Sequence, residues 1–175
     1  MDNKETKELR VNLTNWHGKP CTKSDLSKLQ TIAKKESDFL AELYAKYDGL
    51  QFQINGETAG LVVASVSELE QYNSDWRDWF SEYAAEDLQD FEKEGVAFAT
   101  IHQSGNYFVM YEGKVYYGDH DGGNDEVWGD SLQDFFTKAL SDPPKFLTDA
   151  GCYTRYYDGK TDTQYIPEKF ESGEA

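Results

Sequence analysis

The fold is decided by the stretch from Val96 to Gly118, which reads VAFATIHQSGNYFVMYEGKVYYG. It contains three short runs rich in β-branched and aromatic residues, a composition typical of strands. Two short connections that contain glycine, Ser104–Asn106 and Glu112–Gly113, separate these runs. Connections this short join antiparallel neighbours, so the stretch predicts a three-stranded meander. Its strands are Val96–His102, Tyr107–Tyr111 and Lys114–Gly118.

Two helical patterns lie closer to the N-terminus. Thr22 or Ser24 is suited to cap a helix whose apolar residues recur at spacings of three and four. A second apolar face stops at Asp48-Gly49, because glycine readily adopts the left-handed conformation that terminates a helix. The residues of the two faces are Leu26, Leu29, Ile32 and Ala33, followed by Phe39, Leu40, Leu43, Tyr44 and Tyr47.

Two strands and a longer helix are expected between these faces and the meander. Residues 50–54 alternate in polarity, and residues 61–64 form an apolar run that suggests a strand buried on both faces. Ser65 and Glu68 have the spacing of a capping box and open the helix. That helix, or a successor ending near Gly95, has acids on one face and aromatic or apolar residues on the other. The latter are Trp76, Trp79, Phe80, Tyr83, Leu88 and Phe91.

Ser131 and Asp134 have the spacing of another capping box, which opens a last helix through Leu140, ended by Asp142-Pro143-Pro144. This order predicts an α+β fold with a central antiparallel meander sheet and helices packed on one side. We expect a loosely ordered segment at residues 1–21, one domain at 22–142 and a C-terminal extension at 143–175. The extension is compatible with a further hairpin packed on the domain.

The net charge of −16 is unevenly distributed along the 175 residues. Residues 1–35 contain eight basic and four acidic residues, whereas the remainder contains nine basic and 29 acidic ones. Such an acidic body repels nucleic acids and anionic membranes, and it attracts basic partners. The charge also supports solubility, so by itself it does not select a function.

The chain has few signs of export or membrane insertion. Its first residues are polar and lack the apolar segment of a signal peptide. No apolar run approaches the roughly 20 residues that a membrane span requires. Cys21 and Cys152 could pair, but two cysteines do not make a disulfide framework. We therefore expect a cytoplasmic protein.

The catalytic constellations that we considered are incomplete. His120-Asp121 would need further ligands to form a metallohydrolase site, and only His17 and His102 remain as histidines. Neither cysteine lies in a motif that would activate it as a nucleophile.

The acidic loop after the meander resembles a calcium-binding loop at Asp119, Asp121 and Asp125. Counted from Asp119, however, the fifth position is Gly123 and the twelfth is Asp130, where an EF-hand needs an oxygen ligand and a glutamate. We expect no enzymatic activity, no cofactor and no metal site.

Three ordered stretches resemble the SUKH superfamily, which includes the yeast Smi/Knr cell-wall regulators and many bacterial immunity proteins. Residues 39–50, FLAELYAKYDGL, look like the family's helix ending in an aromatic-Asp-Gly turn. Residues 62–72 are similar to its strand followed by Ser-x-x-Glu-Leu, and residues 96–140 to its meander and terminal helix. The Leu-Pro usual before the first long helix is absent, and residues 75–94 and the tail after Pro143 look like additions.

The resemblance implies an immunity-type protein that binds and neutralises a cognate bacterial toxin domain, for example a nuclease. Nuclease surfaces are basic because they hold phosphates, so an acidic inhibitor suits them. The alternative is a regulatory or scaffolding domain with a non-toxin partner. The aromatic stripe also fits a core face, but acidic and aromatic residues form the interface that we expect. They are Trp76, Trp79, Glu82, Tyr83, Glu86, Asp87, Asp90, Asp119, Asp121 and Asp125.

Overall fold

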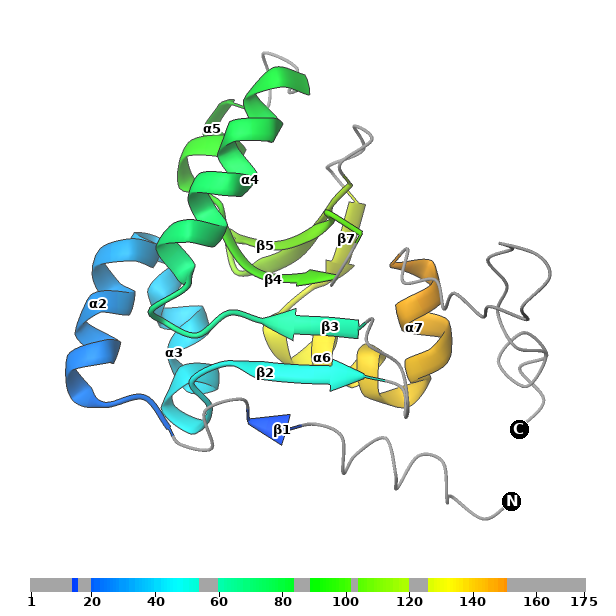
Figure 1. Ribbon diagram of the computed structural model, residues 1–175, viewed down its shortest axis with the longest axis horizontal. Helices are drawn as coiled ribbons and strands as arrows, with labels where there is room; N and C mark the ends of the chain where they lie inside the picture. The colour runs from blue at the N-terminus through cyan, green and yellow to red at the C-terminus, as the bar shows by residue number, and fades with distance from the viewer. Residues whose placement is uncertain are drawn as a thin grey trace, which may run out of the picture.

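Among the residues that the structure describes, seven strands form one antiparallel sheet in which each strand pairs with its sequence neighbour (Figure 1). The computed structural model describes residues 14–15, 20–53, 60–83, 89–101, 104–119 and 126–150. The α+β class and the predicted meander are confirmed, and the described part of its first strand ends at Ile101. The strands are β1 (Thr14–Asn15), β2 (Leu50–Gln53), β3 (Gly60–Val63), β4 (Val96–Ile101), β5 (Tyr107–Tyr111), β6 (Lys114–Gly118) and β7 (Glu126–Gly129).

Helices lie between two pairs of successive strands and after the last strand. Between β1 and β2 lie α2 (Lys23–Ala33), the 3-10 turn η1 (Lys34–Glu36) and α3 (Ser37–Lys46). Between β3 and β4 lie α4 (Leu69–Tyr83) and α5 (Gln89–Glu94), and α6 (Leu132–Ser141) and α7 (Pro143–Asp149) follow β7.

Several helix boundaries follow the predicted local signals. The side chain of Thr22 accepts a hydrogen bond from the amide of Asp25, and that of Ser131 accepts one from Asp134. Each bond satisfies an amide that the first turn of a helix leaves without a partner. After α3, Gly49 has a φ of 91°, the left-handed conformation expected there.

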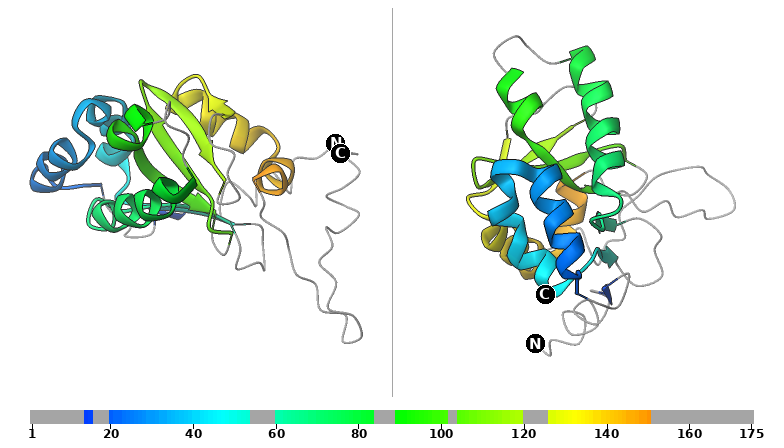
Figure 2. Two further views of the ribbon diagram at one scale, coloured as in Figure 1. Left: turned by 90° about the horizontal axis from the view of Figure 1, so that it is seen from above. Right: turned by 90° about the vertical axis from the view of Figure 1, so that its left-hand side faces the viewer.

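Helices cover both faces of the sheet, which corrects the expectation of helices on one side only (Figure 2). Alternate residues of a strand point to opposite faces. In β4 and β5, Phe98 and Phe108 belong to a large core with residues of α2, α3, α6 and α7. Ala97 and Val109, which pair across the two strands, instead belong to a smaller core with α4 and α5. The central strands are buried on both faces, so each face needs its own helices.

The segment after residue 142 begins as a helix of the main core. Pro143 opens α7, a position that suits proline because the first helical turn needs no amide donor there. Phe146, Leu147 and Ala150 are buried in the large core. The expected boundary at residue 142 therefore does not separate a packed domain from an appended segment, and the hairpin predicted beyond it lies outside the described residues.

A buried carboxylate joins the α2–α3 junction to the turn between β5 and β6. Glu36 is only 3% exposed. Its Oε1 accepts a hydrogen bond from the amide of Glu112 at 2.9 Å, and its Oε2 accepts one from Gly113 at 3.1 Å. Glu112 and Gly113 both have positive φ, as a tight hairpin turn of this kind requires. The carboxylate thus satisfies two turn amides and ties two segments 76 residues apart in sequence.

Replacing Glu36 with glutamine should destabilise the fold by about 2 kcal/mol, because one acceptor oxygen becomes an amide donor that faces a backbone N–H. Urea denaturation followed by circular dichroism measures the change. Glu42→Gln is the matched control, since it removes an exposed carboxylate on α3 that pairs with Lys46. It should change the stability far less, because exposed ion pairs contribute little. Equal losses in the two variants would show that the buried carboxylate does not anchor the turn.

Candidate protein-binding surface

The α4–α5 pair stands on the sheet through its own aromatic core. The rings of Trp76 and Phe80 in α4 lie 5.2 Å apart, and both contact the ring of Phe91 in α5. All three side chains are buried against Ala97 and Val109. Such a cluster of large rings fixes the position of the two helices on β4 and β5.

A buried asparagine docks α4 at the point where β3 ends. β3 stops pairing with β4 at Val63 opposite Ala99, so the backbone of Ala97 has no strand partner on that side. The side chain of Asn73 replaces it: Oδ1 accepts from the Ala97 amide and Nδ2 donates to the Ala97 carbonyl, both at 3.0 Å. Because Asn73 is only 3% exposed, this pair of bonds positions α4 on the sheet.

Arg77, the one basic residue of α4, is turned toward the end of α5. Its Nε donates to the carbonyl of Glu92 and its Nη2 to that of Gly95, each at 3.0 Å. The guanidinium therefore caps carbonyls at the C-terminal end of α5, where a positive charge is favourable. Burial lowers the pKa of Arg77 from its usual value, with the charge of Glu92 opposing the shift. The guanidinium of Arg77 therefore joins α4 to the end of α5.

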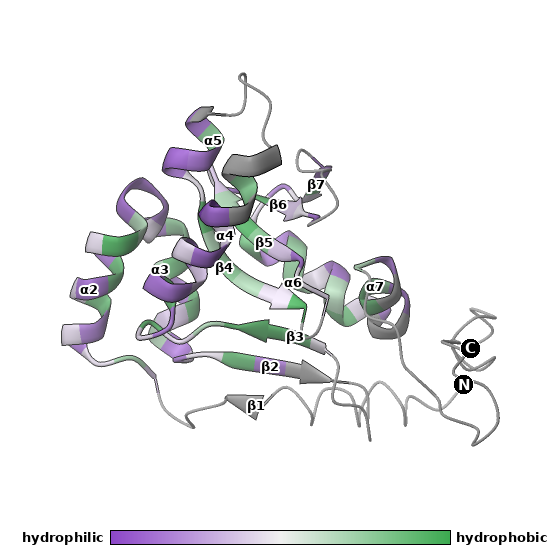
Figure 3. Cartoon of the chain, turned by 45° about the horizontal axis from the view of Figure 1, so that its top comes forward, coloured by the Kyte–Doolittle hydropathy of each residue, from purple (hydrophilic) through white to green (hydrophobic). Residues whose placement is uncertain are grey.

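The outer surface of the pair is left strongly acidic, and hydrophilic residues follow its outer turns (Figure 3). Among the described side chains, Lys93 is the exposed cation of the two helices, and Lys35 of η1 forms an ion pair with Glu94 at 2.7 Å. We call this region the acidic surface of α4–α5. Its exposed carboxylates are Glu70, Asp75, Asp78, Asp90 and Glu94.

Burial and nearby negative charge raise the pKa of two tyrosines, Tyr107 and Tyr111, which lie at opposite ends of β5. Burial, and then the charge of Asp75, raises the pKa of Tyr107. Burial, and then the charges of Glu112, Glu94 and Asp90, raises the pKa of Tyr111. A nearby carboxylate opposes formation of the tyrosinate anion. The acids of α4 and α5 therefore flank β5 at both ends.

The first residue of the predicted acidic loop follows the end of β6. Tyr107 pairs with Gly118, and Asp119 follows Gly118 directly. Asp119 therefore follows the residue that pairs with Tyr107, the tyrosine whose pKa the charge of Asp75 raises.

The predicted interface residues have different positions. Trp76 is fully buried, so its indole cannot serve as a surface anchor while the small core is intact. Asp90 is exposed on α5, and Asp119 is partly buried. Trp79, Glu82 and Tyr83 belong to α4, although their side chains lie outside the described part. Glu86, Asp87, Asp121 and Asp125 lie wholly outside it.

A groove between α3 and α6, with a mixed lining of apolar and polar side chains, is a surface feature that the sequence did not indicate. It has a volume of about 320 Å³. Phe39 and Tyr47 border it with 49% and 40% of their surface exposed. The spacing of apolar residues predicts both on the buried face of a helix. However, α3 ends at Lys46, so Tyr47 leaves that face, and Phe39 lies 100° from Leu40 at its edge. Only the exact position at which α3 ends would have shown that Tyr47 is exposed.

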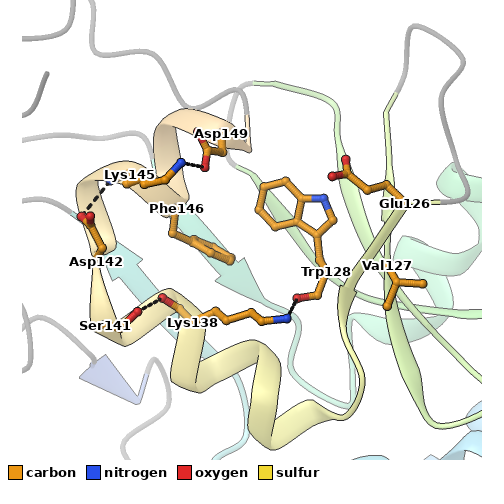
Figure 4. A pocket seen from close by; sticks show the side chains of 9 residues that line it. All are labelled: Glu126, Val127, Trp128, Lys138, Ser141, Asp142, Lys145, Phe146 and Asp149. Carbon is orange, nitrogen blue, oxygen red and sulfur yellow. Dashed lines mark hydrogen bonds and ion pairs between the residues drawn. The ribbon is translucent and has the colours of Figure 1, made fainter. Parts of the chain in front are cut away.

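A second cavity, of about 540 Å³, lies beside the edge strand β7 (Figure 4). The rings of Trp128 and Phe146 border it, 5.3 Å apart. Its lysines are engaged within the chain: Lys145 pairs with Asp149 at 2.6 Å, and Lys138 pairs with Asp134 and donates to the carbonyl of Trp128. The indole N–H of Trp128 is buried without an acceptor among the described residues.

The described residues contain no group of three or more His, Cys, Asp or Glu side chains placed to hold a metal ion. Cys21 is partly buried just before α2. Burial raises the pKa of its thiol to about 12, and the hydrogen bond and charge of Asp48 act in the same direction. This thiol is therefore protonated at neutral pH and a poor nucleophile.

No family model matches this chain, and no curated protein is significantly similar to it. Within the part of the chain that the structure describes, no helix has the length and apolar character needed to cross a bilayer.

Cys21 should react slowly with iodoacetamide in the folded Cys152→Ser variant. At pH 9, a thiol with a pKa near 12 is ionised in about one molecule in a thousand, whereas an ordinary cysteine is largely ionised. Mass spectrometry of samples alkylated between pH 7 and 9 measures the rate.

Two comparisons check the cause. Unfolding in urea should restore the rate of an ordinary cysteine, and Asp48→Asn should accelerate the reaction because it removes the carboxylate that opposes ionisation. Rapid alkylation of the folded protein at pH 8 would contradict the raised pKa.

Proposed function

We propose that this chain is an interaction domain that binds a basic protein partner through the acidic surface of α4–α5. The observation that carries this proposal is the excess of exposed acids over exposed cations on these two helices. Among the described side chains, five carboxylates are exposed on α4 and α5, and Lys93 is the exposed cation. The guanidinium of Arg77 is turned toward the carbonyls at the end of α5.

A strongly charged surface of this kind mainly increases the rate at which two proteins associate. Like charges concentrated on one region steer an oppositely charged protein and accelerate association, in a manner that salt weakens. The small aromatic core beneath holds the helices in place, so the charges are presented on a fixed scaffold. Apolar anchors would supply the remaining affinity, and Trp79 and Tyr83 of α4 are our candidates for them.

The resemblance to the SUKH superfamily suggests a specific form of this function, which is neutralisation of a toxin domain. A toxin that acts on nucleic acid has a basic phosphate-binding surface. An acidic domain that covers this surface excludes the substrate without catalysing a reaction. In this form of the proposal, Asp75, Asp90 and Asp119 occupy positions near those of substrate phosphates.

The test is co-expression with the protein encoded beside this chain, followed by kinetics on the purified pair. Asp75→Lys combined with Asp90→Lys should lower the association rate constant at low salt at least about tenfold. Asp130→Lys combined with Asp149→Lys is the matched control. It makes the same change in net charge at exposed acids of β7–α6 and α7.

Equal slowing by both double variants would show that total charge matters and the acidic surface of α4–α5 does not. If no complex forms, the protein encoded beside this chain is not its partner. Toxicity of the partner expressed alone, relieved by co-expression, supports the immunity form. A bound but harmless partner indicates a regulatory or scaffolding domain instead.

A further inference from the structure

The strand β7 forms one edge of the sheet. Among the described residues it pairs with β6 alone, and Val127 on it has 41% of its surface exposed. An edge strand offers unpaired backbone groups to other chains, and proteins usually protect it with a lysine, a proline or a covering segment. β7 has the sequence EVWG, which contains neither lysine nor proline. A covering segment is the protection that remains.

The cavity beside β7 offers aromatic rings and a carboxylate that no cation of the described residues neutralises (Figure 4). The rings of Trp128 and Phe146 lie 5.3 Å apart at its border. Of its acids, Asp149 pairs with Lys145 at 2.6 Å. Glu126 is exposed, and within the described part of the chain it has no ion-pair partner. An arginine flanked by aromatic side chains would match this lining.

The chain leaves α7 at the border of this cavity. The hydroxyl of Tyr117 donates a hydrogen bond to the carbonyl of Ala150 at 3.0 Å. Tyr117 pairs with Glu126 across the two strands, and its ring stacks on that of Trp128 with the centroids 4.8 Å apart. The residues that follow Ala150 therefore start close to both side chains that the cavity leaves available.

The composition of these residues suits the cavity. Residues 151–157, GCYTRYY, contain three tyrosines, and their one charged side chain is that of Arg155. Five residues separate Arg155 from Ala150, so an extended chain reaches up to about 17 Å from that point. A guanidinium binds a carboxylate through two parallel hydrogen bonds, and tyrosine rings pack favourably on other aromatic rings.

We propose that residues 152–157 of this chain lie along β7 and across the cavity beside it, with Arg155 paired with Glu126 and tyrosine rings packed on Trp128 and Phe146. A segment attached at the border of its site has an effective concentration in the millimolar range, an advantage that a separate protein lacks. A second copy of the chain is a poorer occupant, because both copies carry a charge of −16. The docked segment would cover the edge that β7 otherwise presents to other chains.

Hydrogen exchange of the full chain, followed by mass spectrometry, tests this docking. The backbone amides of residues 152–157 should exchange at least about tenfold more slowly than those of an unstructured peptide. Arg155→Glu and Glu126→Arg should each accelerate this exchange at least about threefold, because each substitution places like charges together. The two substitutions combined restore opposite charges, so the exchange should slow again toward the wild-type rate.

Two further charge reversals serve as matched controls. Lys169→Glu reverses a cation that follows the proposed segment in the sequence. Asp130→Arg reverses an exposed acid just after β7 that does not border the cavity. Neither should change the exchange of residues 152–157, and circular dichroism checks that every variant is folded.

The proposal is overturned if residues 152–157 exchange as fast as an unstructured peptide, or if Glu126→Arg leaves a slow exchange unchanged. A double variant that exchanges faster than both single variants rules out the pairing of Arg155 with Glu126. Protection that grows with protein concentration also overturns the proposal, because the segment then binds a second copy. These outcomes do not depend on the proposed partner complex, since α4 and α5 pack on the opposite face of the sheet from α6 and α7.

Discussion

The central strands β4 and β5 have almost no surface that water reaches, and this constraint shapes the rest of the molecule. Phe98 and Phe108 point to one face, while Ala97 and Val109 point to the other. Burial of such side chains is the main favourable contribution to folding, and it requires a helical layer on each face. α2, α3, α6 and α7 form one layer, and the α4–α5 pair forms the other. A single layer would leave one set of these residues in water.

Individual buried polar groups then determine where each layer sits. Glu36 connects the α2–α3 junction to the β5–β6 turn, and Asn73 connects α4 to the backbone of β4. Arg77 connects α4 to the end of α5. A buried polar group that lacks its partner is costly, so these contacts favour one arrangement over others with similar apolar burial. Arg77 thereby serves the contact between the two helices, while the exposed side chains of the pair are mostly acidic.

Features that depend on neighbouring residues could be predicted from the sequence, whereas features that depend on contacts between residues far apart in the sequence could not. Caps at Thr22 and Ser131 and the turn at Gly49 depend on local signals, and they were predicted. The side of the sheet that α4 covers depends on a contact between Asn73 and Ala97, 24 positions apart, which no local pattern contains. The acids of α4 and α5 were recognisable by composition, but the burial of Trp76 depends on its helix lying over β5. The α3–α6 groove was missed because α3 ends one residue before Tyr47.

The place of the α4–α5 pair along the chain has a consequence for how proteins of this architecture diversify. It lies between β3 and β4, which pair directly with each other, so the sheet closes around its point of insertion. Its core of Trp76, Phe80 and Phe91 is separate from the large core. Substitutions at exposed positions of α4 and α5 therefore need not alter strand register, whereas Leu69 at the start of α4 belongs to the large core and is constrained by it. The exposed surface of the pair can change in sequence while the sheet is kept.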